Sequence, residues 1–243
     1  MNKLITNIYS GLQVERSTCS IECGRSQFFI VERPQYHDFK FFFRTRGNET
    51  ILPPLSRMLE KKNCINTEYV SFDRDNDTEK FLRSLNFMEV GELVRMKFNG
   101  QYKGYKNPNT IIDCRQEDRE QIEHIICAKF DSTTEGLLHL NEISKAINAG
   151  DIKIIKKGEN VVGMYWAQRK PGIFELRYLY VFPEQRGGGI GQSLLADYQE
   201  KAISEKKKCL LWVRKCNVLA LSIYEKYGFK QDGLKCFVFT RTG

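Results

Sequence analysis

Hydrophobic positions along the first hundred residues alternate or cluster in short runs, which predicts strands with two helices between them. Alternation predicts strands because successive side chains point to opposite faces of a sheet. Pro53-Pro54 stands at a helix start, where the first turn tolerates proline. The second helix places Phe81, Leu82 and Leu85 on one face. The expected strands are 4–17, 28–32, 39–44, 68–72 and 87–98, and the expected helices are 55–62 and 75–85.

A polar segment, 101–109, contains a glycine and a proline and is typical of a linker. We therefore predict an N-terminal domain at 1–100 and a second domain at 110–243. In the second domain, the helix 116–130 directs Ile122, Ile125 and Ile126 inward. The other expected helices are 140–148, 190–205 and 217–227, and the expected strands are 110–114, 152–156, 161–169, 174–181, 209–213 and 229–240.

Two stretches of the chain, 70–98 and 212–240, share the order strand, helix, strand. A shift of 142 residues aligns Phe87 with Phe229 and Gly91 with Gly233. We interpret the chain as two copies of one half-fold, with chance recurrence of common elements as the alternative.

The positive charge of the chain is diffuse. Its formal net charge is +8, and Lys206-Lys207-Lys208 is its only run of three like charges. A diffuse positive field attracts an anionic ligand such as a nucleotide or coenzyme A. Nucleic-acid binding would require a basic patch with stacking aromatic residues, so we expect no nucleic-acid partner.

Cysteine spacing and the length of the apolar runs bear on compartment and metal content. The eight cysteines form no CxxC pair, which favours reduced thiols and no metal site. No run approaches the roughly 18 apolar residues that a membrane span requires, and the N-terminus has no apolar signal core. We therefore expect a cytoplasmic protein without a membrane partner.

A glycine-rich loop, Arg186-Gly187-Gly188-Gly189-Ile190-Gly191, joins a predicted strand to a predicted helix. Glycines let a backbone approach a ligand closely, and the N–H groups at a helix start attract anions. The loop is therefore suited to a pyrophosphate. It matches neither the Rossmann pattern nor the Walker A pattern, which requires Gly-Lys-Ser or Gly-Lys-Thr. A tight connection without a ligand is the alternative.

Two motifs resemble those of one family. Residues 181–195, VFPEQRGGGIGQSLL, resemble motif A of the GCN5-related N-acetyltransferases (GNAT), with Arg186, Gly189 and Gly191 in its fixed places. Residues 217–229, NVLALSIYEKYGF, resemble motif B of that family. The resemblance covers about 110–240 and implies an α+β fold, with a mixed, mostly antiparallel central sheet flanked by helices. The first hundred residues resemble an incomplete copy of that fold.

The resemblance also implies an enzyme, one that transfers an acetyl group from acetyl-CoA to a primary amine by direct attack in a ternary complex. Asn217 would touch the cofactor arm, and Tyr224 would protonate the leaving thiolate, unless it is only a core aromatic residue. Tyrosine suits this role because its ordinary pKa of about 10 keeps it protonated at neutral pH. The expected cofactor-binding residues are Leu179, Tyr180, Val181, Arg186, Gly187, Gly188, Gly189, Ile190, Gly191, Gln192 and Asn217.

The general base is expected at Glu175, because some family members relay the amine proton through a glutamate at this place. Glu175 lies six residues before Val181 on one predicted strand, so we expect the two side chains to share a face. A surface carboxylate is the alternative. Arg177 could pair with Glu175 or bind an anionic substrate.

The acceptor is less defined than the donor. The two-part plan resembles that of enzymes that acetylate sugar-nucleotide amines, so a small-molecule amine is expected, with protein or peptide acceptors open. The segment Gly47–Pro54 stands where a second pyrophosphate loop would lie, but its prolines lack N–H groups. We expect this half to bind no CoA. The main alternative function is that of a non-catalytic regulator that binds acyl-CoA. The oligomeric state is left open, and a homodimer is one of the states considered.

Overall fold

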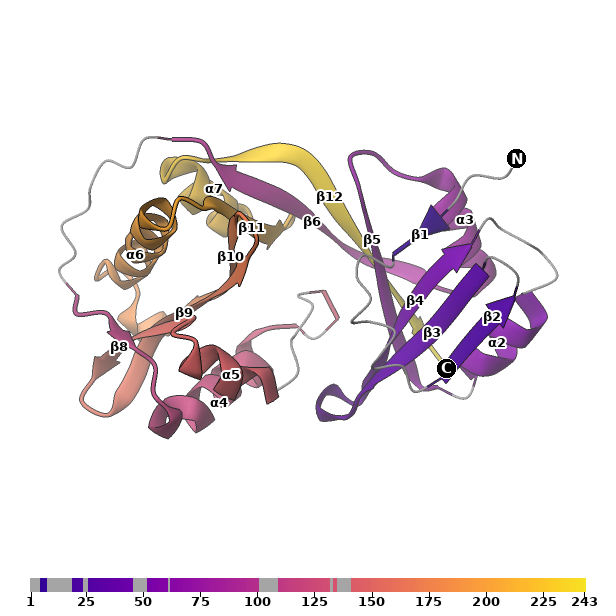
Figure 1. Ribbon diagram of the computed structural model, residues 1–243, viewed down its shortest axis with the longest axis horizontal. Coiled ribbons are helices and arrows are strands. Elements are labelled where there is room, and N and C mark those ends of the chain that lie inside the picture. The colour runs from indigo at the N-terminus through magenta and orange to yellow at the C-terminus, as the bar shows by residue number, and fades with distance from the viewer. Residues whose placement is uncertain are drawn as a thin grey trace. The chain divides into compact units, whose positions relative to one another are not determined.

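The computed structural model describes residues 5–7, 19–23, 26–45, 52–60, 62–100, 109–131, 133–134 and 141–243. The chain forms two compact units (Figure 1). Unit 1 consists of Met1–Leu93, Ser132–Gly136 and Gly233–Gly243, and unit 2 of Val94–Asp131 and Leu137–Asp232. The division at 101–109 stays a prediction, because most of that segment lies outside the described residues.

Unit 1 is a sheet with two helices on one face. Its strand order is β2-β3-β4-β5-β12, and β1 pairs with β4. The β4–β5 pair is parallel, whereas β2–β3, β3–β4 and β5–β12 are antiparallel. The elements are β1 (Ile5–Thr6), β2 (Cys19–Cys23), β3 (Ser26–Arg33), η1 (Pro34–Tyr36), β4 (Asp38–Thr45), α2 (Leu52–Glu60), β5 (Cys64–Ser71), α3 (Asn76–Ser84) and the end of β12 (Phe229–Thr242).

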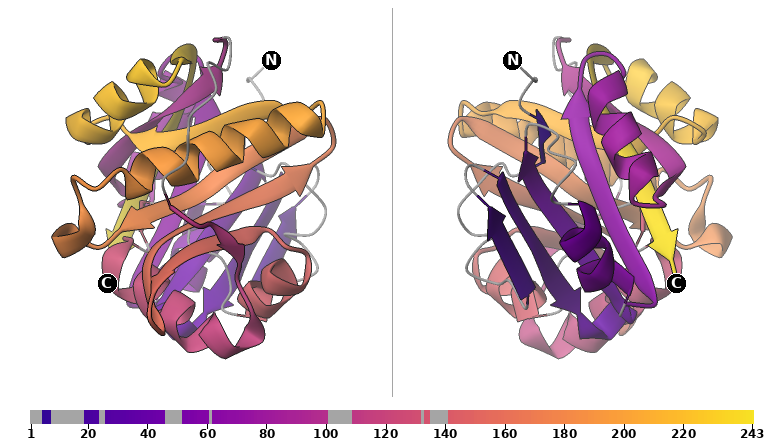
Figure 2. Two further views of the ribbon diagram at one scale, coloured as in Figure 1. Left: turned by 90° about the vertical axis from the view of Figure 1, so that its left-hand side faces the viewer. Right: turned by 90° about the vertical axis from the view of Figure 1, so that its right-hand side faces the viewer.

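The core of unit 1 is mainly aromatic. Phe28, Phe41 and Phe43 of β3 and β4 are buried in one cluster with residues of α2 and α3. Both helices lie on the same face of these strands (Figure 2, right). Phe81 of α3 packs its ring 5.3 Å from that of Phe43, and Phe87 stacks 5.7 Å from Phe41. This packing follows from the period of two in the strands and from the single apolar face of α3.

The strands of unit 2 lie in the order β6-β11-β10-β9-β8-β7. The β10–β11 pair is parallel, whereas β7–β8, β8–β9 and β9–β10 are antiparallel. The remaining elements are β6 (Met88–Phe98), β7 (Ile112–Asp113), η3 (Gln116–Asp118), α4 (Arg119–Lys129), α5 (Asn141–Asn148), β8 (Ile152–Lys157), β9 (Asn160–Lys170), β10 (Ile173–Val181), η4 (Pro183–Gln185), α6 (Ile190–Ser204), β11 (Lys208–Arg214) and α7 (Val218–Lys226).

Helix α6 covers one face of the unit 2 strands (Figure 2, left). Leu194, Leu195 and Tyr198 of α6 are fully buried there, as the sequence pattern predicts. The hydroxyl of Tyr198 donates to the Phe174 carbonyl at 2.5 Å and accepts from the Leu210 N–H at 3.1 Å, so it ties α6 to both strands of the parallel pair. On the other face, Phe130 at the end of α4 packs edge-on against Tyr178 of β10.

The internal repeat is confirmed in its geometry. Helices α3 and α7 occupy the same positions once the sequence is shifted by 142 residues. Each begins at a capping side chain, Asp75 or Asn217. Each is followed by a residue with a left-handed backbone, Asn86 at φ 62° or Gly228 at φ 84°. In each unit a strand from the other half of the sequence completes the strand order, because β12 pairs with β5 and β6 pairs with β11.

The predicted elements are largely confirmed, with shifted ends. The helix predicted at 116–130 begins instead with the 3₁₀ turn η3, in which Asp118 accepts from the Arg115 N–H at 3.0 Å. Strand β2 was missed, because its five residues (CSIEC) have little hydrophobic pattern. Of the strand predicted at 4–17, only residues 5–7 lie within the described part.

Candidate active site

The candidate site lies where the parallel strands of unit 2 separate. β10 pairs with β11 only over Ile173–Leu176 and Lys208–Leu211. β10 then continues to Val181, and β11 continues to Arg214. A cavity of about 520 Å³ lies between the end of β10, the glycine loop and α7. This volume is in the range of small-molecule sites.

The glycine loop follows β10 and leads into α6. Gly187 and Gly189 have φ values of 86° and 78°, which only glycine adopts without strain. A Cβ at Gly187 would meet no atom within 4 Å, so its backbone is open to a ligand. Arg186 donates through Nε to the Val181 carbonyl at 3.1 Å, which holds the loop against the end of β10.

The start of α6 presents N–H groups to the cavity. The first bond inside the helix runs from the Ser193 N–H to the Gly189 carbonyl at 2.9 Å. N–H groups before that point have no acceptor within the helix, and the helix dipole adds a partial positive charge there. Gly191 packs close to β10, since its Cβ would lie 3.6 Å from Val181 Cγ2. This arrangement is suited to an anion such as a pyrophosphate.

Helix α7 forms the opposite wall of the cavity. The Asn217 side chain accepts from the Ala220 N–H at 3.1 Å and thereby fixes the start of α7. The Tyr224 ring packs edge-on against Phe229, with 5.9 Å between ring centres. Tyr224 also lines the cavity and packs against the core of unit 2.

The structure brings most of the predicted residues together. Eleven of them line the cavity: Leu179, Tyr180, Val181, Arg186, Gly187, Gly189, Ile190, Gly191, Gln192, Asn217 and Tyr224. Gly188 and Glu175 do not line it. The sequence analysis missed the other lining residues of α7, which are Leu219, Ala220, Ile223, Lys226 and Tyr227. Spacing of three and four residues from Tyr224 could have found two of them, Ala220 and Tyr227.

Glu175 does not share the face of Val181, so that expectation is wrong. β10 has one residue more than β9 between Leu176 and Tyr178, which is a β-bulge. The bulge inverts the alternation of side chains along β10. Leu176 and Val181 both pack on the α6 side of the sheet, and Glu175 is on the other.

Glu175 lies in a buried cluster of charges. Its carboxylate pairs with Lys170 Nζ at 2.6 Å and with Arg177 Nη1 at 2.9 Å. Burial opposes ionisation, but the two cations hold the pKa of Glu175 below its usual value. The expected alternative, an Arg177–Glu175 ion pair, is therefore what the structure contains.

No group of three His, Cys, Asp or Glu side chains among the described residues is arranged to hold a metal ion. None of the seven cysteines whose side chains the structure describes forms a disulfide. None of the described helices combines the length and the apolar composition that a membrane crossing needs.

Comparisons with known proteins agree with this geometry. Residues 148–231 match the sequence model of the acetyltransferase (GNAT) domain. A comparison with curated proteins gives no match.

Several solved structures share the fold at low identity. A GCN5-related N-acetyltransferase from Sphaerobacter thermophilus superposes with a TM-score of 0.64 at 11% identity, covering 90% of this chain and 76% of that one. A GCN5-related N-acetyltransferase from Kribbella flavida gives 0.62 at 12% identity, with 96% and 93% covered. A tandem GNAT protein from the clavulanic acid biosynthesis pathway gives 0.62 at 8% identity, with 89% and 78% covered.

Proposed function

Because the chain carries an acetyltransferase domain of the GNAT superfamily, we propose that it transfers an acetyl group from acetyl-CoA to a primary amine of a small molecule. The observation that carries this proposal is the cavity between β10 and α7, with the glycine loop at one end and Tyr224 in its wall. The loop suited to an anion and a group able to donate a proton line the same cavity. Transfer of an acyl group from a CoA thioester requires both.

The donor is assigned to the glycine loop. Its backbone N–H groups and Arg186 would hold the pyrophosphate, and the end of β10 at Leu179–Val181 would lie along the pantetheine arm. A side chain at Gly187 or Gly189 would force a non-glycine residue into the left-handed region. The positive φ values of the loop therefore require glycine. The open space beside Gly187 leaves room for a ligand.

The reaction is assigned as direct attack. A neutral amine attacks the thioester carbonyl, the C–N bond forms, the C–S bond breaks, and the thiolate takes a proton from Tyr224. A phenol suits this step because it stays protonated at neutral pH and donates to a stronger base. No covalent acyl-enzyme is required.

Glu175 is ionised and held by two cations, so it is a poor proton acceptor in this conformation. We assign Glu175 and Arg177 to the acceptor side of the sheet, where a substrate that displaces Lys170 would free one carboxylate oxygen. The amino group of a sugar nucleotide is one acceptor of this kind.

Acetyl-CoA binding is the first test. A ligand at a hundred times its Kd stabilises the folded state by about 2.7 kcal/mol, which corresponds to a Tm increase of about 5–10 °C for a chain of this size. Gly187→Ala should abolish this increase. Gly158→Ala is the matched control, because Gly158 also has a left-handed φ and open space around it but lies in the β8–β9 turn. An absent shift in the unmodified protein would contradict the proposal.

Turnover is the second test. Release of free CoA thiol should be measured with a panel of amines that includes amino-sugar nucleotides, polyamines and peptides with free N-termini. Binding of acetyl-CoA without thiol release from any amine would favour the non-catalytic regulator. If CoA thiol is released only with peptides, the acceptor is a protein or peptide and not a small molecule.

A further inference from the structure

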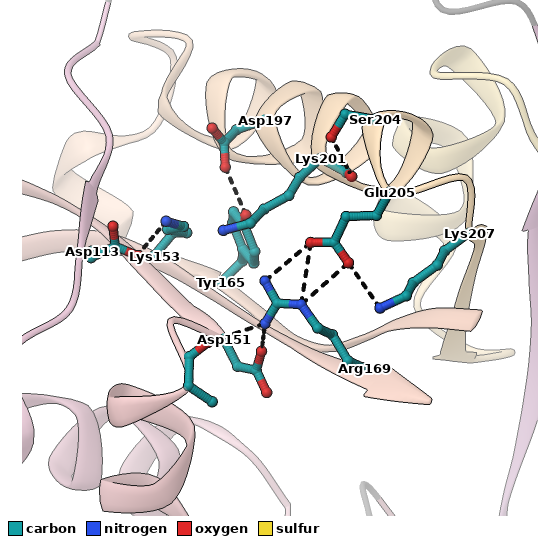
Figure 3. Close-up of polar contacts among 11 residues, drawn as sticks. Asp113, Asp151, Lys153, Tyr165, Arg169, Asp197, Lys201, Ser204, Glu205 and Lys207 are labelled. Atoms are coloured by element: carbon teal, nitrogen blue, oxygen red, sulfur yellow. Dashed lines mark hydrogen bonds and ion pairs between the residues drawn. The ribbon is translucent and has the colours of Figure 1, made fainter. Parts of the chain in front are cut away.

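A second group of charged side chains lies under the C-terminal half of α6, away from the cavity (Figure 3). Lys201 stands eleven positions after Ile190, where α6 begins, which separates them by about 16 Å along the helix. The group draws on α6 and on strands β7, β8 and β9 of unit 2. None of its residues lines the cavity.

Every carboxylate of this group is engaged by a residue other than Lys201. Asp113 of β7 pairs with Lys153 of β8. Asp197 of α6 accepts from the Tyr165 hydroxyl at 2.6 Å. Glu205, just after α6, pairs with Arg169 at 3.2 Å and Lys207 at 2.8 Å, and Asp151 also pairs with Arg169.

Lys201 thus lacks the partners that its helix would normally supply. Asp197 and Glu205 are four residues before and after it, the spacing at which ion pairs form on a helix. Both are taken by other elements, and within the described part of the chain no carboxylate lies within ion-pair distance of Lys201. Its half-buried amine instead lies within hydrogen-bonding reach of Lys153.

The two lysines respond to this arrangement in opposite ways. Burial and then the adjacent Lys153 lower the pKa of Lys201 to about 8. Asp113 raises the pKa of Lys153 against the effect of burial. The charged groups that face Lys201 are therefore Lys153 on β8, Arg169 on β9, Asp113 on β7 and, on α6 itself, Asp197, with the Tyr165 phenol beside it.

We propose that Lys201 is a modification site, a nucleophilic lysine that is acetylated by activated acetyl donors in solution, thioester or acyl phosphate. The step needs no catalytic residue of the cavity. The neutral Nζ attacks the carbonyl carbon, the amide C–N bond forms, and the bond to sulfur or phosphate oxygen breaks. The leaving thiolate or phosphate takes the electron pair, and the proton lost by the amine passes to water.

The geometry explains why Lys201 should react before other lysines. At pH 7.5, a lysine with a pKa near 8 has roughly 200 times more neutral amine than one with the ordinary value of 10.4. Lower basicity also weakens the nucleophile, so the net gain in rate is about tenfold. Lys153 keeps its charge through Asp113 and is only 13% exposed, so it should react slowly.

The experiment uses the full chain and measures site-resolved acetylation rates by mass spectrometry after incubation with acetyl phosphate, and in parallel with acetyl-CoA. The reference is Lys145, an exposed lysine in the last turn of α5. At pH 7.5 we expect Lys201 to be modified about tenfold faster than Lys145. The rate at Lys201 should level off above pH 8, while that at Lys145 keeps rising to pH 10. Equal rates, or parallel pH profiles, would overturn the proposal.

A charge variant tests the role of the neighbour. Lys153→Met removes the adjacent cation and releases Asp113 for pairing with Lys201, so the Lys201 rate should fall to within about twofold of Lys145. Lys129→Met, which removes an exposed charge at the end of α4, should leave it unchanged. An unchanged rate in Lys153→Met contradicts the proposal. Tyr224→Phe should alter neither rate, which separates this chemistry from the proposed enzyme activity.

Discussion

Helices α3 and α7 are equivalent by the internal repeat, yet α3 packs into a core and α7 lines a cavity. Both have nine residues, a capping side chain and a left-handed residue after the last turn. In α3, Thr78, Phe81 and Leu82 are buried. In α7 no residue is buried, and its apolar side faces the cavity. Tyr224 occupies the position that Leu82 holds in α3.

The helices that join the parallel strands differ in the same way. Helix α2 has Pro53 and Pro54 in its first turn, and proline has no N–H to offer an anion. Helix α6 starts at Gly189 and follows the glycine loop. The same backbone plan therefore gives a packed unit in one copy and a unit with an open cavity in the other. The difference depends on a few residues at the helix starts and on one face of a helix.

The largest expected difference between the two helices is in stability. Phe81→Ala should lower the free energy of unfolding by about 3–5 kcal/mol, because it leaves a hole beside Phe28 and Phe43. Ile223→Ala, at the equivalent position in α7, should cost less than about 1 kcal/mol, since Ile223 is 40% exposed. Urea unfolding of both variants measures the difference. Similar losses would show that α7 is packed as tightly as α3.

The next effect concerns catalysis. Tyr224→Phe should lower kcat by about 100-fold, the range of a lost general acid, while the Kd for acetyl-CoA changes little. Tyr36→Phe in unit 1 is the matched control and should keep full activity. Thiol-release kinetics with the best amine from the panel provide the measurement. Full activity in Tyr224→Phe would return this residue to a packing role.

One buried carboxyl group in each unit has a shifted pKa, and the two shifts have opposite directions. The two groups should therefore affect the pH dependence of stability in opposite ways. The pKa of Glu175 in unit 2 is lowered, so its stabilising effect is present above its unfolded value of 4.5 and is lost as pH falls through the folded value. The pKa of Asp38 in unit 1 is raised, because burial outweighs its contacts with Arg33 and Asn66. Its ionisation therefore costs stability as pH rises from 3.8 through the folded value.

Variants of these carboxyls should change the pH dependence in opposite directions. Glu175→Gln should cost about 2 kcal/mol at pH 7, since it removes charged hydrogen bonds, and should flatten the loss of stability in acid. Asp38→Asn should make the rise of stability between pH 4 and pH 7 steeper. Urea unfolding at several pH values tests both, and slopes equal to that of the unmodified protein would contradict the assigned directions.

The smallest expected effect is that of removing the capping side chains of α3 and α7. It distinguishes a capping role of Asn217 from a role in binding acetyl-CoA. Asp75→Ala and Asn217→Ala should each cost about 1 kcal/mol of stability, because each removes an acceptor for a first-turn N–H group. Only Asn217→Ala should also weaken acetyl-CoA binding, by about tenfold. Calorimetric titration distinguishes the two variants. Unchanged affinity in Asn217→Ala would restrict Asn217 to its capping role.

Much of the candidate site could be predicted because it is local in sequence. The glycine loop and the α7 motif each lie within one short segment, and together with the end of β10 they supply the eleven predicted residues that line the cavity. Glu175 shows where local reasoning fails. Its face depends on a bulge in β10, and a bulge is defined by register against β9, which periodicity along one strand does not contain. Lys201 is similar, since its neighbours come from three strands.

The sequence by itself determined the helices, most strands, the repeat and the glycine loop, because backbone propensities, caps and glycine conformations act over a few residues. The tertiary structure decided which copy of the repeat keeps an open cavity, which strands are exchanged between the halves, and which charges meet. These depend on contacts between segments far apart in the chain. The residue types restrict which of these contacts can form, but the packing of strands and helices decides which ones do form.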